Sequence, residues 1–296
     1  METHYFLTIL QIMRPQHWIK NGLVVMPLVV GYHYHSLEAL RKNIIGFTVF
    51  CLLAASVYVI NDWVDREHDA QHPYKKNRPF ASGQLSPQTV YWLIPTLFFS
   101  ALSLMYYLPI TFFIVAVSYY LTTFFYSFFL KKRKWLDIIT LVWLYLLRIL
   151  AGMTLVENGY SPWLLFLGFF LFMSLALVKR YAELCRVHAT GQSTLLGRAY
   201  GWQDSNTVFV LGHLSAYAAT LVFVFYIFSQ KVALFYPHPF ILIPINPLLL
   251  VWISRLWYLA AQGKIQDDPV SFTIKDRFSW LIVLIIASIA ALARHA

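Results

Sequence analysis

Residues 51–86 read CLLAASVYVINDWVDREHDAQHPYKKNRPFASGQLS, in which a strongly apolar run changes within a few residues into a dense group of carboxylates and cations. The apolar part also extends upstream, so that residues 42–63 form a stretch of helix long enough to cross the roughly 30 Å of a membrane's hydrocarbon core. We therefore predict a membrane span over residues 42–63 that ends in a charged segment at the membrane surface.

The charged segment carries an Asn-Asp-x-x-Asp-x-x-x-Asp pattern. If the helix continues into it, Asn61, Asp65 and Asp69 share one face, and Asp62 borders the same stripe. Mg²⁺ suits such a cluster, because it usually binds one or two protein carboxylates and completes its octahedron with water and substrate phosphate oxygens. We predict that these four residues hold Mg²⁺ and act in catalysis. The alternative is a solvated helix end.

Cations follow directly, at Lys75, Lys76 and Arg78, and lead into a turn-prone Arg-Pro-Phe-Ala-Ser-Gly segment. A loop of this kind can fold back over the metal, where Lys75 and Arg78 would neutralise phosphate charge. Arg78 could do so through two parallel hydrogen bonds. The alternative is that these cations anchor the loop to anionic lipid.

The composition places the whole chain in a membrane. Of its 296 residues, 59% are hydrophobic and 12% are charged, and the mean hydropathy is +0.60, which excludes an ordinary water-soluble domain. We predict an all-α, polytopic membrane protein with a single transmembrane domain over residues 1–296. Its nine expected spans are 18–36, 42–63, 88–106, 109–130, 135–155, 161–180, 206–228, 240–259 and 277–295.

The distribution of charge orients these spans. The formal net charge is +10, and nine crossings place nearly all the cations on the side of the N-terminus. The positive-inside rule then predicts a cytoplasmic N-terminus and an outer C-terminus. Most carboxylates fall on the cytoplasmic side too, although topology selects only weakly on them. Carboxylates with surplus cations on one side suit a polyanionic substrate that is bound through a divalent metal and through Lys and Arg.

Further polar residues stand inside or beside later spans. Asp137 begins the fifth span, and Arg148 lies eleven residues later on the same helix face, well inside the apolar run. An ionisable residue at that depth indicates either a functional site or a structural pair with a neighbouring helix. Tyr126 and Lys131 could join the site from the preceding helix end. The run from Lys131 to Lys134 is also typical of a topology signal.

The sixth span closes with LVKRYAELCR, which contributes Lys179, Arg180, Tyr181 and Glu183. Farther on, DDPVSFTIKDRF precedes the last span. Its carboxylates, Asp267, Asp268 and Asp276, are read either as a second acidic wall or as a solvated loop.

The pattern NDWVDREHD at the end of the second of nine predicted spans resembles the UbiA superfamily of membrane prenyltransferases. The segments MRPQHWIKN, HPYKKNRPFASG, LLRILAG, KRYAEL and DDPVSFTIKDR are similar to its branch of decaprenyl-phosphate phosphoribosyltransferases. The resemblance covers nearly the whole chain. Members that act on aromatic acceptors carry a second Asp-rich motif after the sixth helix, where this chain has Lys179, Arg180, Tyr181 and Glu183. A second metal cluster is therefore not expected.

The resemblance implies a UbiA-like helical bundle in a bacterial inner membrane, with a cytoplasmic active site and a part in cell-envelope biosynthesis. It implies transfer of 5-phosphoribose from 5-phosphoribosyl 1-diphosphate to a polyprenyl phosphate, with Mg²⁺ as cofactor and pyrophosphate as product. No nucleic-acid partner is expected, and a homo-oligomer is allowed. The substrate-binding residues would be Lys20, Lys75, Arg78, Tyr126, Lys131, Asp137, Arg148, Lys179, Arg180, Tyr181 and Glu183.

Two other functions remain open from the sequence. The first is transfer of a prenyl group from a polyprenyl diphosphate to an aromatic acceptor. The second is membrane transport, although transporters tend to interrupt their helices near the middle of the bilayer, whereas the carboxylates here stand at helix ends.

Overall fold

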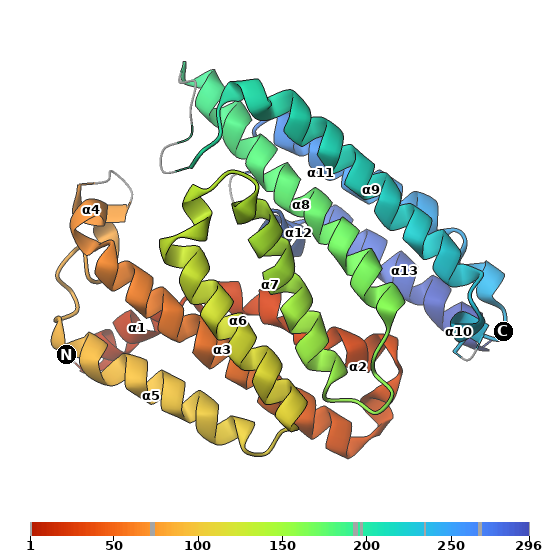
Figure 1. Ribbon diagram of the computed structural model, residues 1–296, viewed down its shortest axis with the longest axis horizontal. Helices are drawn as coiled ribbons and strands as arrows, with labels where there is room; N and C mark the ends of the chain where they lie inside the picture. Colours follow the sequence, from red (N-terminus) through yellow and green to blue (C-terminus); the bar gives the residue numbers. More distant parts are fainter. Residues whose placement is uncertain are drawn as a thin grey trace. The chain divides into compact units, whose positions relative to one another are not determined.

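The computed structural model describes residues 2–71, 75–191, 195, 198–233, 235–265 and 268–295, and all regular secondary structure within these ranges is helical (Figure 1). Eight helical segments in this part of the chain are long and apolar enough to cross a membrane. The predicted all-α membrane architecture is confirmed. The eight segments are Leu37–Val64 (α3), Gln88–Met105 (α5), Ile110–Phe128 (α6), Leu136–Met153 (α7), Pro162–Ala189 (α8), Trp202–Ile227 (which contains α9, Ser205–Ile227), Pro239–Ala261 (which contains α11, Ile245–Ala261) and Arg277–His295 (α13).

The first predicted span, residues 18–36, is the exception. It consists of a 3-10 helix, Pro15–Val24 (η1), a five-residue helix, Met26–Val30 (α2), and a further 3-10 turn, His33–His35 (η2). A proline stands in the first turn of both η1 and α2. Proline cannot donate the backbone hydrogen bond that a continuing α-helix needs, so it begins a new helical segment. A separate helix, Glu2–Met13 (α1), precedes this region and was not predicted.

Two compact units can be distinguished. The first comprises residues 1–128 and 147–160, and the second comprises residues 129–146 and 161–296. Helix α7 therefore contributes its first part to the second unit and its last part to the first unit. The prediction of one domain over residues 1–296 stays a prediction.

The first unit is built around α3, with α5 lying alongside it (Figure 1). One core cluster joins these two helices to α1 and to the loop after α3, through Ile12, Ala55, Val59, Phe80 and Leu93. Trp63, near the end of α3, packs its ring edge against Phe80 with centroids 5.4 Å apart. The loop that follows the charged segment is thus fixed to the end of α3 by apolar packing, and this holds Arg78 beside the carboxylates.

The second unit is built around α8 and α9, which run side by side (Figure 1). Trp257 of α11 is buried and donates from its indole to Ser174 of α8 at 3.1 Å. Its ring occupies the space beside Gly212 of α9, where an added Cβ would come within 1.9 Å of the indole. This packing fixes the part of α8 that carries the predicted Lys179–Glu183 group.

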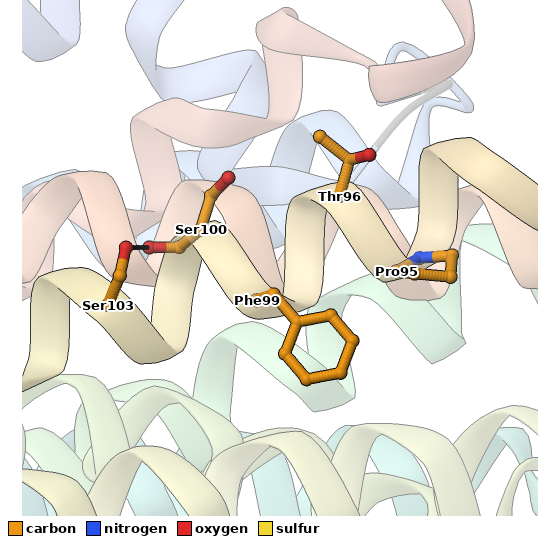
Figure 2. A pocket seen from close by; sticks show the side chains of 5 residues that line it. All are labelled: Pro95, Thr96, Phe99, Ser100 and Ser103. Atoms are coloured by element: carbon orange, nitrogen blue, oxygen red, sulfur yellow. Dashed lines mark hydrogen bonds between the residues drawn. The ribbon is translucent and has the colours of Figure 1, made fainter.

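One pocket lies on α5 and is lined by Pro95, Thr96, Phe99, Ser100 and Ser103 (Figure 2). The hydroxyls of Thr96 and Ser103 donate to backbone carbonyls of their own helix, at 2.7 and 2.9 Å. No carboxylate or cation lines it. The predicted chemistry therefore does not belong to this pocket.

Candidate functional site

The predicted helical path through the charged segment is confirmed, with one interruption. Helix α3 ends at Val64, and a short helix, Arg66–Ala70 (α4), follows Asp65. The backbone N–H of Asp65 donates to Asn61 at 2.9 Å, and that of Asp69 donates to Asp65 at 2.8 Å, so the hydrogen-bond ladder continues. Asp62 and Asp69 are seven residues apart, which is about two turns, and so lie on one side of this path.

Asp62 and Asp69 are brought together by a single arginine. The Nη1 atom of Arg78 lies 3.3 Å from Oδ1 of Asp62 and 2.6 Å from Oδ2 of Asp69. Arg14, at the end of α1, adds a second guanidinium, with its Nη2 atom 2.5 Å from the same Oδ1 of Asp62. The two carboxylates are only 3% and 2% exposed, whereas the arginine side chains are 22% and 29% exposed. Two buried negative charges thus meet two half-buried positive charges.

The other two predicted ligands have different surroundings. Asn61 donates from its amide to the hydroxyl of Ser127 at 3.0 Å, across to α6. The half-buried carboxylate of Asp65 makes no hydrogen bond or ion pair with another described residue. The described part of the chain contains no ready-made group of three or more His, Cys, Asp or Glu side chains around a metal position.

The donor chemistry nevertheless fits a magnesium ion. Mg²⁺ usually takes one or two protein carboxylates and fills its remaining positions with water and phosphate oxygens. Asp62 and Asp69 offer two buried carboxylates, and one cationic nitrogen already reaches both of them. Asp62 and Asp69 would be the residues that hold such an ion, and the ion would supply positive charge that Arg78 supplies in this structure.

The predicted phosphate-binding cations of the first unit are partly described. Lys75 has its backbone in a 3-10 turn, Lys75–Asn77, and its side chain lies outside the described residues. Lys20 is half-buried in η1. Arg148 is buried, with only 6% of its surface exposed, and donates to Oδ1 of Asn21 at 2.9 Å and to the hydroxyl of Tyr119 at 2.8 Å. Both of these partners are neutral side chains, on η1 and α6.

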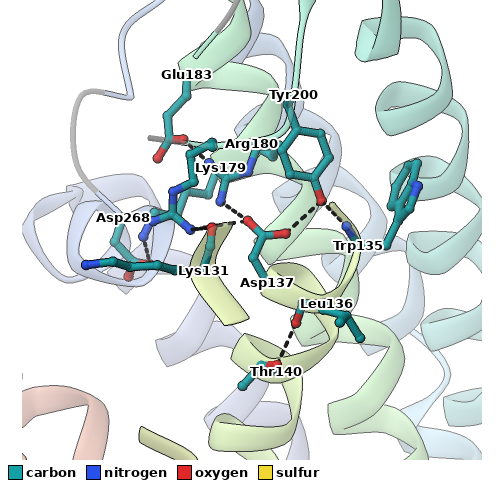
Figure 3. Close-up of polar contacts among 11 residues, drawn as sticks. Lys131, Trp135, Leu136, Asp137, Thr140, Lys179, Arg180, Glu183, Tyr200 and Asp268 are labelled. Atoms are coloured by element: carbon teal, nitrogen blue, oxygen red, sulfur yellow. Dashed lines mark hydrogen bonds and ion pairs between the residues drawn. The ribbon is translucent and has the colours of Figure 1, made fainter. Parts of the chain in front are cut away.

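Asp137 is the centre of a second polar cluster, in the second unit (Figure 3). It is fully buried and accepts a hydrogen bond from Arg180 Nη2 at 2.5 Å, from Arg198 Nη1 at 3.3 Å and from the hydroxyl of Tyr200 at 2.7 Å. Arg180, also fully buried, forms a further ion pair with Glu183. Arg180, Asp137 and Glu183 were predicted to bind substrate. That role stays a prediction, and in this structure the three side chains form ion pairs within the cluster.

Arg198 and Tyr200 were missed by the sequence analysis. They lie between two spans in a segment that has no motif of its own, so only the fold brings them to Asp137. Burial raises the pKa of the Tyr200 phenol, and the hydrogen bond to the Asp137 carboxylate raises it further. The phenol therefore stays protonated and remains a donor. Arg14 was missed as well, although it stands in the quoted segment MRPQHWIKN.

Lys179, inside α8, is more accessible than the neighbouring Arg180. Its ammonium lies 3.8 Å from Oδ1 of Asp268, at the long end of an ion pair, and its side chain is 24% exposed (Figure 3). Asp268 also accepts from the Tyr145 hydroxyl at 3.4 Å and caps the helix Pro269–Lys275 (α12). Of the second acidic segment, Asp267 lies outside the described residues. Asp276 forms an ion pair with Arg255.

The remaining predicted residues lie near the end of α6 and inside α8. Tyr126 is half-buried near the end of α6, and Lys131 lies in the 3-10 turn Leu130–Lys132, where its carbonyl accepts from Arg198 at 3.2 Å. Tyr181 packs between aromatic rings, with centroids 5.6 Å from Phe209 and 5.5 Å from Trp257. Such packing favours a structural role for its ring, while the substrate roles of all three residues stay predictions.

A family model described as the UbiA prenyltransferase family matches residues 24–282 of the chain. A solved structure of a UbiA homolog from Archaeoglobus fulgidus, described as bound to GPP and Mg²⁺, aligns with a TM-score of 0.67 at 16% identity. The alignment covers 96% of this chain and 99% of that one. At this identity the likeness shows the shared fold, which extends over nearly the whole chain.

Several curated proteins are similar in sequence. A nodulation protein, NoeC, from Azorhizobium caulinodans is 31% identical over 280 residues, which cover 94% of this chain and 91% of that protein. A decaprenyl-phosphate phosphoribosyltransferase from Mycobacterium tuberculosis is 28% identical over 280 residues, covering 93% and 90%. A Sinorhizobium fredii protein is 32% identical over 285 residues, and the chain spans only 55% of its length.

Proposed function

Since the chain belongs to the UbiA prenyltransferase family, we propose that it transfers 5-phosphoribose from 5-phosphoribosyl 1-diphosphate to a polyprenyl phosphate and releases pyrophosphate. The choice of this reaction within the family is supported by the relatives named decaprenyl-phosphate phosphoribosyltransferase, at 28% identity over nearly the whole chain and at 35% over 187 residues.

The observation that carries the proposal is the buried pair Asp62 and Asp69, bridged by Arg78. Together with Asp65 and Asn61, these residues would hold Mg²⁺ against the diphosphate of the donor. The ion would stabilise negative charge that gathers on the leaving diphosphate as the bond to the anomeric carbon breaks. Arg78 and Lys75 would bind the phosphate oxygens that the ion leaves uncompensated.

The attacking group is the phosphate of the lipid, which is already anionic at neutral pH. No strong general base is then required, and much of the rate comes from holding the two reactants in line. We propose Lys179 as a phosphate-binding residue, because its side chain is partly exposed and only loosely paired with Asp268. Lys131 is assigned the same role. Arg180 and Asp137 are fully buried and paired, so we assign to them the positioning of Glu183 and of the end of α8.

For the location, we propose a bacterial inner membrane with the loops after α3, α6, α8 and α11 in the cytoplasm. Consecutive crossings would put these four loops on one side, and they carry 11 of the chain's 23 Lys and Arg residues, whereas the loops after α5, α7 and α9 carry only Lys231. Phosphoribosyl diphosphate is a soluble metabolite, so a cytoplasmic active site gives the enzyme access to it.

The test is a direct assay of the purified protein in detergent. Incubation with Mg²⁺, a polyprenyl phosphate and labelled phosphoribosyl diphosphate is expected to give pyrophosphate and a labelled lipid, identified by mass spectrometry as polyprenyl-phosphoryl-5-phosphoribose. A chelator is expected to stop the reaction. Absence of labelled lipid with every chain length tried, in a preparation that remains folded, would contradict the proposal.

A second candidate is prenyl transfer, favoured by the family's name and by the solved neighbours described as bound to GPP or to DMAPP with Mg²⁺. The same preparation with a polyprenyl diphosphate and an aromatic acceptor separates the two. Only this second reaction would give a prenylated aromatic product.

A further inference from the structure

Arg14 stands at a joint in the chain where its backbone conformation is unusual. It lies between α1 and η1 with φ 54° and ψ 60°, in the left-handed region that residues other than glycine rarely adopt. Pro15 follows and begins η1. Such a conformation persists only where the surrounding structure holds the residue in place.

The contacts of the Arg14 side chain hold the residue in this backbone conformation. Its guanidinium lies 2.5 Å from Oδ1 of Asp62 and is centred 5.3 Å from the ring centroid of Tyr58, one turn earlier on α3. Arg14 therefore reaches from the end of α1 onto the carboxylate that the proposed function gives to Mg²⁺. The oxygen it contacts is the same one that Arg78 approaches at 3.3 Å.

The charges of these side chains determine how the site responds to the binding of a divalent metal ion. The cluster of Asp62 and Asp69 with Arg14 and Arg78 brings two negative and two positive formal charges together. A divalent ion at Asp62 would raise the local charge by two and would meet Arg14 on the same oxygen. Like charges at this distance repel, most strongly beside a carboxylate that is only 3% exposed.

We infer that Arg14 is a counter-ion which competes with the divalent metal for Asp62, and whose guanidinium binds the diphosphate once the metal has displaced it. The inference rests on the proposed function. It makes metal and diphosphate mutually dependent, because the anion compensates both the ion and the displaced arginine. Each ligand then tightens the binding of the other by the same factor, as linkage requires.

The first experiment measures Mn²⁺ binding to the detergent-solubilised full chain, from the paramagnetic resonance signal of the free ion. Arg14→Gln is expected to bind Mn²⁺ roughly fivefold or more tightly than the wild type, which is the lower range of a typical coupling between sites. The matched control is Arg66→Gln. It removes the same charge nearby, but Arg66 forms its ion pair with the exposed Glu67 and stacks on Trp63, and no ion pair joins it to Asp62. Its Mn²⁺ affinity should equal that of the wild type.

The second experiment measures retention of labelled inorganic pyrophosphate with and without Mn²⁺, by equilibrium dialysis. In the wild type Mn²⁺ should increase retention strongly. In Arg14→Gln the increase should be smaller, and Arg14→Lys should restore part of it. If Arg14 only supports the fold, its substitution will lower the melting temperature without tightening Mn²⁺ binding, and the inference is then wrong.

The failure of the proposed function would look different. In that case Mn²⁺ would fail to bind the wild type, or would bind equally well to Asp62→Asn. If the inference is wrong but the proposed function is right, Mn²⁺ binding will still depend on Asp62 and will be the same in Arg14→Gln as in the wild type. If Arg14→Gln does not fold, Arg14→Lys serves for both measurements, with weaker pyrophosphate retention than the wild type as the expected result.

Discussion

At the scale of single residues, the carboxylates of the charged segment differ in how their charge is balanced. Asp62 and Asp69 are buried against arginines, whereas Asp65 is half-buried and makes no ion pair with another described residue. A carboxylate without an internal counter-ion suits a ligand that is completed by an added cation. Substitutions at these positions should therefore separate catalytic from structural effects.

We predict that Asp65→Ala lowers the rate of transfer by about a hundredfold or more and leaves the melting temperature in detergent nearly unchanged. The size follows from the loss of one charge-stabilising group at the leaving diphosphate. Asp69→Asn should lower both activity and stability, because it removes the charge of the nearer of the two carboxylates that pair with Arg78. Glu67→Ala is the control, since Glu67 is 82% exposed. Full activity of Asp65→Ala with Mg²⁺ would remove Asp65 from the site.

At the scale of helices, close approach of backbones fixes α7 against the region that was predicted as the first span. Gly152 of α7 packs on the backbone of η1, where an added Cβ would lie 2.0 Å from the carbonyl oxygen of Val24. Backbone atoms cannot move aside as a flexible side chain can. Arg148, one turn earlier on α7, donates to Asn21 of the same η1, so this contact also sets the position of Arg148.

Gly152→Ala is therefore expected to destabilise the protein by about 1–3 kcal/mol, the usual cost of overpacking a core. Thermal unfolding in detergent, or loss of monodisperse protein on size exclusion, measures the effect. Gly22→Ala is the matched control, because an added Cβ at Gly22 meets nothing within 4 Å. Equal stability of the two variants would mean that η1 can shift freely against α7.

A second helix-scale link joins α11 to α13 and should depend on pH. Burial would raise the pKa of Asp276, but hydrogen bonds from Arg255 and Ser279 outweigh it, so the pKa lies below its ordinary value. A carboxyl group whose pKa is lower in the folded protein than in the unfolded chain stabilises the fold above the unfolded pKa, about 3.9. That stabilisation is lost as the pH falls further.

The melting temperature of the wild type should therefore exceed that of Asp276→Asn at pH 6, and the difference should shrink as the pH is lowered toward 3. Glu67→Gln provides the comparison, because its exposed carboxylate should contribute little at either pH. A difference that is independent of pH would show that the charge of Asp276 plays no part in the link.

At the scale of the whole molecule, the proposed topology can be tested on the two ends of one helix. Gln84 and Tyr107 are exposed and flank α5, a candidate span. In a variant lacking Cys51 and Cys185, we expect Gln84→Cys to react with a membrane-impermeant thiol reagent only from the cytoplasmic side. Tyr107→Cys should react only from the other side. Labelling of both from the same side of sealed vesicles would contradict the crossing.

Much of the architecture could be predicted from the order of residues alone. Apolar runs long enough to cross the membrane indicate where spans begin and end. Hydrocarbon offers no hydrogen bonds to the backbone, so a single segment that crosses it must form its backbone hydrogen bonds internally, as a helix does. The end of the apolar run over residues 42–63 likewise predicted that Asp62 and Asp69 stand at a helix end. The segment 18–36 shows the limit of this reasoning. Its composition suits a span, but Pro15 just before it and Pro27 within it each begin a separate short helical segment.

What only the tertiary structure decided is which charges meet. Arg14 lies 48 residues before Asp62, and Arg180 lies 43 residues after Asp137, separations at which no helical or strand repeat applies. Local pattern fixes the side on which a residue emerges from its own helix. Ion pairs depend on how other helices pack against it, and that packing is set by contacts such as Gly152 on Val24 and Trp257 on Gly212. The sequence therefore determined the membrane fold and the position of the Asn-Asp-x-x-Asp-x-x-x-Asp pattern at a helix end, and the packing determined the partner of each charge.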